Sequence, residues 1–276
     1  MSTEEEIDVH GDVSIDQLDL AAERPGSGRT ATPEIAEYAT RLGDDALILS
    51  QQLGWWISRA PELEEDLALG NIALDLLGHA RAFLNFAGTA SNRDEDEMAF
   101  MRDEPEFFNC WLVEQPGNEF GSMLARQLYF SAYQVQLYTA LEHSADESLA
   151  AIGAKARREV TYHLDHAVMW TLRLAGGTDE SRRRLIVALE DMWPYVEELF
   201  IDDELTNSLD GIAIRPSSLR AGFDETLAAV FAEAGLELPM ARPAATGGRQ
   251  GRHSTPFGYI LAEMQWLARR HPGAKW

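Results

Sequence analysis

The segment at residues 63–88, LEEDLALGNIALDLLGHARAFLNFAG, constrains the fold most strongly because a helix made from it is apolar on every side. One apolar stripe repeats at spacings of three, four and seven residues and comprises Leu63, Leu67, Gly70, Leu74, Leu77 and Leu84. The opposite side carries Ile72, Leu76, Phe83 and Phe86. Such a helix is either an interior helix or a membrane span, and the acids in its first turn exclude a span. We therefore expect it to lie between neighbours.

The rest of the chain indicates an all-α fold. The run Thr32-Pro33-Glu34 begins a helix that extends to Ala60, with a possible irregularity at Gly43. Further helices are expected at residues 120–144, 147–174, 181–200, 217–235 and 257–270, with short pieces between residues 98 and 120. Long helices with short connections favour a ferritin-like up-down four-helix bundle with additional C-terminal helices, spanning residues 32–276. Residues 1–31 are acidic without a helical period, and we expect a disordered extension there.

Charge and composition exclude several functions. The chain has 46 Asp plus Glu against 23 Lys plus Arg, and its net charge of −23 disfavours binding to nucleic acid or to anionic membranes. Cys110 is the single cysteine, so a metal site would have to use carboxylates and imidazoles. The acidic start MSTEEEIDV is unlike a signal peptide, which favours a cytoplasmic protein. Lysine occurs only at Lys155 and Lys275, and this acidic, lysine-poor composition suggests a halophilic source.

Two helices combine an acid and a histidine four residues apart. Asp75 and His79 share one face of the helix at 63–88, and Glu159 and His163 share one face of the helix at 147–174. Facing helices with this pattern are typical of carboxylate-bridged di-iron centres in ferritin-like bundles. In such a centre the first helix would contribute Asp44 or Asp45.

The di-iron pattern is incomplete. The residues three after the two acids are Gly78 and Tyr162, where a di-iron site has histidines. The third helix places Ser131 where a carboxylate is needed, and its next acid, Glu142, lies about 16 Å farther along. The favoured interpretation is therefore a buried hydrogen-bonded or ionic network of the four residues, with Arg81 or Arg126 as further partners. His166 is interpreted as an ordinary core or surface histidine.

A glycine-rich and arginine-rich segment lies near the C-terminus. Residues 247–253, GGRQGRH, could hold a phosphate or a carboxylate through arginines and backbone amides. The segment follows no strand and opens no phosphate-binding helix of a known pattern, so we favour a contact with another subunit for it.

Several long blocks resemble one family. They are LGDDALILSQQLGWW, APELEEDLALGNIALDLLGHAR, FMRDEPEFFNCWLVEQPGNEF, VTYHLDHAVMW and GRHSTPFGYILAEMQWLARR. In this order, over residues 36–276, they resemble the C subunits (PaaC) of bacterial phenylacetyl-CoA 1,2-epoxidases. The resemblance implies a structural, non-catalytic subunit without a cofactor. It pairs in a hetero-oligomer with a catalytic A subunit, whose di-iron site and a separate reductase oxidise the aromatic ring with O₂ in phenylacetate degradation.

The resemblance also assigns the residues of a degenerate di-iron site. Its vestigial ligand positions are Asp44, Asp75, Ser131 and Glu159, with Gly78 and Tyr162 in the places of histidines. His79 stands where relatives are expected to have glutamine, and with His163 it leaves single-metal binding open. The alternative function is a metal-dependent oxidase that uses Asp75, His79, Glu159 and His163. A weaker alternative is a ferritin-like storage or binding protein without an oxygenase partner.

Overall fold

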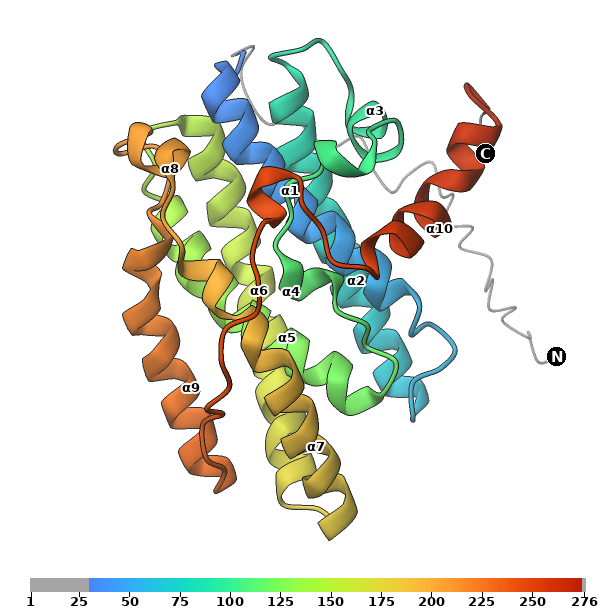
Figure 1. Cartoon of the computed structure of the whole chain (residues 1–276), viewed down its shortest axis with the longest axis vertical. Helices are drawn as coiled ribbons and strands as arrows, with labels where there is room; N and C mark the ends of the chain where they lie inside the picture. Colours follow the sequence, from blue (N-terminus) through green and yellow to red (C-terminus); the bar gives the residue numbers. More distant parts are fainter. Residues whose placement is uncertain (1–29, 275–276) are drawn as a thin grey trace, which may run out of the picture.

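The computed structural model describes residues 30–274, and within them it contains helices and no β-strand (Figure 1). The α-helices are α1 (Pro33–Gly54), α2 (Leu63–Gly88), α3 (Glu95–Phe100), α4 (Trp111–Glu114), α5 (Phe120–Leu141), α6 (Glu147–Ala175), α7 (Asp179–Met192), α8 (Glu204–Ser208), α9 (Arg220–Ala234) and α10 (Phe257–Arg270). Short 3₁₀ helices are η2 (Glu104–Glu106), η3 (Trp193–Tyr195), η4 (Glu197–Phe200), η5 (Pro216–Leu219) and η6 (Gly248–Gln250). The all-α fold class is confirmed. The expected disordered extension falls on residues 1–31, of which residues 1–29 lie outside the described part.

The four long helices α1, α2, α5 and α6 form the bundle. Ser50 of α1 donates a hydrogen bond to the carbonyl of Ala73 at 2.8 Å, and Gly43 lies against Leu84, so α1 and α2 are antiparallel. Gly153 of α6 packs against Leu141 at the end of α5, so these two are also antiparallel. The connection at residues 89–119 carries α3 and α4 back along the bundle (Figure 1). One long crossover of this kind distinguishes ferritin-like bundles from simple up-down bundles.

The enclosed helix of the bundle is α1. Every residue from 38 to 50 is buried, including Arg41, Asp44 and Asp45. In α2 the side with Ile72, Leu76, Phe83 and Phe86 is buried, whereas the leucine stripe is exposed, apart from Leu84 at its end. The expectation that α2 lies between neighbours is therefore wrong for the stripe side, because α4 and α10 pack against α1 instead, and α3 packs only against the C-terminal part of α2, where Glu95 contacts Arg81 and Asn85. By length and composition α2 could cross a membrane, and 44% of its most apolar window is buried.

Helix ends follow local signals except where backbone constraints intervene. Thr32 caps α1, since its Oγ1 accepts the amide of Ile35 at 3.3 Å. The helix ends at Gly54 and not at Ala60, because the next residues form turns in which Ser58 has a φ of +67°. Gly43 causes no irregularity. The helix expected at 181–200 ends at Met192, where Pro194 leads into 3₁₀ turns.

Candidate functional site

The two predicted acid and histidine pairs meet across α2 and α6. Nε2 of His79 lies 2.6 Å from Oε2 of Glu159, and Nε2 of His163 lies 3.0 Å from Oδ2 of Asp75. The two imidazole rings are 6.4 Å apart, so the four side chains form one group. Each histidine of one helix therefore binds the acid of the other, and together the pairs fix the register of the antiparallel helices.

Burial differs between the two partners of each pair. The side chains of His79 and His163 are 4% and 0% exposed, whereas those of Glu159 and Asp75 are 29% and 34% exposed. Burial lowers the pKa of His163, although its hydrogen bond to Asp75 opposes this effect. A neutral His163 donates its Nε2 proton to Asp75. The Nδ1 atoms of both histidines are buried without a protein partner among the described residues.

A third acid and histidine pair extends the row along the same two helices. Nε2 of His166 lies 2.8 Å from Oε1 of Glu65, and the indole nitrogen of Trp170 donates to Oε2 of Glu65 at 2.6 Å. All three side chains are buried, so of the two expected alternatives His166 is a core histidine, and it is paired with Glu65. From the sequence, Glu65 is noticed only as one of the acids in the first turn of α2. It lies fourteen residues, or two heptads, before His79, and this spacing puts both side chains on the same side of the helix. The spacing is the signal by which Glu65 could have been included in the site.

Asp44, a predicted vestigial ligand, does not join this group. Arg102 holds both of its carboxylate oxygens, and the amide of Phe108 donates to Oδ2 at 2.9 Å. Both charged side chains are buried, and burial raises the pKa of Asp44 while Arg102 counteracts that rise. Asp45 is likewise bound elsewhere: Nη2 of Arg249 lies 2.7 Å from its Oδ2. The aspartates of α1 thus neutralise arginines on the side of the bundle that carries the C-terminal segment.

The remaining predicted ligand positions also lie outside the group of acids and histidines. Ser131 is buried and donates to the carbonyl of Gln127 at 2.6 Å. Tyr162 is exposed on the outside of α6, and the position of Gly78 opens onto free space. The suggested partners Arg81 and Arg126 do not contact the group, because Arg81 pairs with Glu95 and Arg126 donates to the carbonyl of Gln115.

These contacts test whether a two-iron centre fits. Each carboxylate in the group is bound to one histidine, and the carboxylate of α1 is neutralised by Arg102. Between residues 30 and 274, no three or more His, Cys, Asp or Glu side chains are arranged to hold a metal ion. A di-iron centre needs carboxylates from all four helices, and α5 offers Ser131. The residues present do not fit such a centre.

The segment GGRQGRH binds to its own chain. The amides of Gly247 and Gly248 donate to Oε1 of Glu198 at 3.1 and 3.0 Å, so the predicted carboxylate site holds an internal carboxylate. His253 contacts the fully buried Glu114 at 2.6 Å through Nδ1. These contacts fasten the C-terminal part of the chain over α1, and the expected contact of the segment with another subunit stays a prediction.

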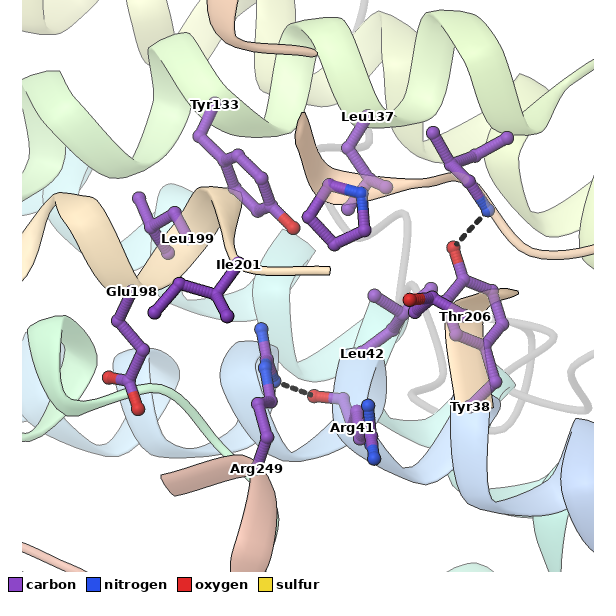
Figure 2. Close-up of a pocket in the computed structure, with 12 residues that line it drawn as sticks. Tyr38, Arg41, Leu42, Tyr133, Leu137, Glu198, Leu199, Ile201, Thr206 and Arg249 are labelled. Atoms are coloured by element: carbon purple, nitrogen blue, oxygen red, sulfur yellow. Dashed lines mark hydrogen bonds between the residues drawn. The ribbon is translucent and has the colours of Figure 1, made fainter. Parts of the chain in front are cut away.

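A small cavity next to this segment has no room for a substrate. Figure 2 shows Tyr38 of α1, Tyr133 of α5 and Arg249 around it. Its volume of about 30 Å³ has room for water but is far below that of a ligand pocket. Burial raises the pKa of Tyr38 to about 12 and that of Tyr133 still further, so both remain neutral phenols. The cavity is a packing feature and carries no evident chemistry.

Comparisons with known proteins agree on one family. A family model described as phenylacetic acid catabolic protein, PaaA_PaaC, matches residues 21–276. The chain is also 46% identical over 246 residues to the C subunit of 1,2-phenylacetyl-CoA epoxidase from Escherichia coli (strain K12). That alignment covers 88% of this chain and 99% of the relative.

Proposed function

The chain belongs to the PaaA_PaaC family of phenylacetic acid catabolic proteins, and on this premise we propose that it is a structural, non-catalytic subunit of a phenylacetyl-CoA epoxidase. In this role it stabilises and positions the oxygenase subunit during aerobic phenylacetate degradation. The partner is the catalytic A subunit, which holds the di-iron site, and the two form a hetero-oligomer. This chain itself holds no cofactor.

One observation carries the non-catalytic assignment. The acids at the former ligand positions are each bound within the chain, Asp44 to Arg102, Asp75 to His163 and Glu159 to His79. A carboxylate that neutralises a buried arginine cannot also bind iron without leaving that arginine uncompensated, which is strongly unfavourable. The interior is therefore suited to fixing helix register.

Iron content tests this proposal. The chain would be produced alone, reconstituted anaerobically with ferrous iron in high salt, and analysed for iron per chain, with the A subunit treated in the same way as a positive control. We expect a value near zero for this chain. A value near one or two per chain, lost in His79→Ala and His163→Ala, would reject the proposal. It would instead support the alternative oxidase, in which Asp75, His79, Glu159 and His163 exchange their mutual hydrogen bonds for a metal.

We also propose a cytoplasmic location and a halophilic source, and the composition supports the second of these. A net charge of −23 with two lysines produces strong self-repulsion, which salt screens. We expect the helical circular dichroism signal to be lost at low salt and regained at molar salt. A fold that is equally stable in dilute buffer would contradict the halophilic part alone.

A further inference from the structure

Arg126 of α5 is a buried cation for which the described residues supply no counter-charge. Its side chain is 0% exposed. Two further arginines are buried between residues 30 and 274, Arg41 and Arg102, and each contacts an aspartate. Burial lowers the pKa of Arg126 to about 10, so the guanidinium is still charged at neutral pH. A buried charge without an opposite charge is strongly unfavourable.

The free polar atoms of Arg126 form one edge of its guanidinium. Nη1 donates to the carbonyl of Gln115, whereas Nε and Nη2 are buried without a partner among the described residues. The N–H groups of one such edge point in parallel, and this geometry lets an arginine bind an anion with two hydrogen bonds. Arg126 therefore presents an anion-binding fork to which the described chain offers no acceptor.

The fork lies at the start of a long helix. Arg126 is in the second turn of α5, and its guanidinium reaches back to Gln115 and Gly117 in the loop before that helix. Glu119 at the N-cap position accepts no capping hydrogen bond through its side chain, and the first turn of α5 contains no acid. The positive end of the helix dipole therefore adds to the charge of Arg126, and both favour an anion.

Gly117 keeps the space beside the fork free of a side chain. A Cβ atom at this residue would lie 3.2 Å from Nη2 of Arg126 and 3.1 Å from Cα of Met123. Gly117 also lines a surface cavity of about 190 Å³, together with Pro116 and Asn118. The loop that contacts the buried guanidinium is thus reached from solvent through this cavity.

We propose that Arg126 and the N-terminal end of α5 bind a small monovalent inorganic anion, for which chloride is the probe. One negative charge balances the single charge of the guanidinium. The net charge of −23 repels anions at low ionic strength, so the site should fill in concentrated salt, where the Debye length is about 3 Å at 1 M. Salt then stabilises this chain by specific binding in addition to screening. The inference does not depend on the function proposed above.

Bromide locates the site directly, because it has the charge of chloride and scatters X-rays anomalously. Crystals of the full chain would be soaked in sodium bromide. We expect an anomalous peak within hydrogen-bonding distance of Nε and Nη2 of Arg126, and none at that place in Arg126→Met. An ordered water there without a bromide peak would overturn the proposal. Peaks at exposed arginines alone would show an adventitious ion only and would overturn it as well.

The chloride dependence of stability tests the same site in solution. Chloride would replace gluconate at constant total salt, and urea denaturation would give the unfolding equilibrium constant. For wild type this constant should fall tenfold for each tenfold rise in chloride above the Kd of one site. Arg126→Met should show only the general effect of exchanging the two anions, so its advantage over wild type should be greatest without chloride.

Two further variants separate the site from unspecific effects of salt. Arg183→Met removes an exposed arginine and should keep the wild-type response to chloride. Gly117→Ala retains the charge of Arg126 but places a methyl group beside Nη2, so it should weaken the response whatever its effect on basal stability. Equal chloride responses of wild type, Arg126→Met and Gly117→Ala would reject the anion site and leave the proposed function intact.

Discussion

Nε2 of His163 lies 3.0 Å from Oδ2 of Asp75, and the histidine is fully buried while the carboxylate is partly exposed. Because burial lowers the pKa of His163, the contact at neutral pH is a hydrogen bond from a neutral imidazole to a carboxylate. An acid and a histidine at this spacing are typical of a metal site, but here their contact joins α2 to α6. Stability and iron content together separate these two roles.

Asp75→Ala should cost stability and leave iron content unchanged. The substitution removes the acceptor of the buried Nε2 proton of His163, and an orphaned buried donor costs about 1–3 kcal/mol. The cost should lie near the lower end of that range because the carboxylate is partly exposed. Urea denaturation measures it, with exposed Asp165→Ala on α6 as the control. Normal stability together with loss of bound iron would contradict the structural role.

His163 should make the protein less stable in mild acid. Its folded-state pKa is below the unfolded value of about 6.5, so the unfolded chain takes up the proton first. The free energy of unfolding should therefore fall as the pH drops below about 6.5, until it passes the folded-state pKa. Denaturation of wild type and His163→Gln in neutral and in mildly acidic buffer measures the difference. Equal pH dependence of the two proteins would show that His163 does not contribute.

Arg102→Met should destabilise the protein by about 3–5 kcal/mol, because it leaves the buried carboxylate of Asp44 without its counter-charge. Adding Asp44→Asn should restore part of the loss. The control is Arg183→Met, which breaks an exposed ion pair with Glu180 and should have little effect. Chemical denaturation of these variants and the wild type decides the matter, and similar losses from the two single arginine variants would refute the distinction.

Arg126→Met should stabilise the protein, in contrast to Arg102→Met. The guanidinium of Arg126 is fully buried, burial lowers its pKa to about 10, and its Nε and Nη2 atoms have no partner among the described residues. Replacing this charged group by an apolar side chain of similar length should raise the free energy of unfolding by about 1 kcal/mol. The carbonyl of Gln115 would keep Gln52 as a donor at 3.3 Å. A melting temperature below that of wild type would disprove this prediction.

Gly43→Ala should lower stability by about 1–3 kcal/mol through overpacking between α1 and α2. A Cβ atom there would lie 2.8 Å from Cγ of Leu84 and 3.2 Å from Cβ of Phe83. Gly78→Ala is the matched control, because its Cβ would meet nothing within 4 Å. In the middle of a helix that change should add about 0.5–1 kcal/mol. Thermal melting of both variants should therefore show shifts in opposite directions.

The fold is predictable from sequence where the signals are local. The sequence marks both ends of α2, Leu63 and Gly88, because charge at the first turn and the end of the apolar pattern are local features. Local features of the sequence do not determine which chain covers the leucine stripe of α2. Hydrophobicity indicates that a surface needs cover, but it does not distinguish a neighbour in the same chain from one in another. For this reason the sequence alone points to α2 as the enclosed helix, whereas the structure encloses α1.

The site is predictable to the same extent. Spacings of four residues place Asp75 and His79 on one face of α2 and Glu159 and His163 on one face of α6, so the sequence predicts the group, and the structure shows which residues pair within it. The role of Asp44 depends on Arg102, which is 58 residues away along the chain, and no helical period encodes that contact. Distant partners of this kind become visible only after the fold has placed them.

The contact between Arg249 and Asp45 joins residues 204 positions apart. While the ribosome is still synthesising the chain, α1 has emerged but the arginine that neutralises Asp45 has not. A nascent or prematurely terminated polypeptide without Arg249 therefore leaves the buried carboxylate of Asp45 without its counter-charge, at a cost in stability. The burial of Asp45 in its final surroundings is therefore a late step of folding that has to wait for the segment around Arg249.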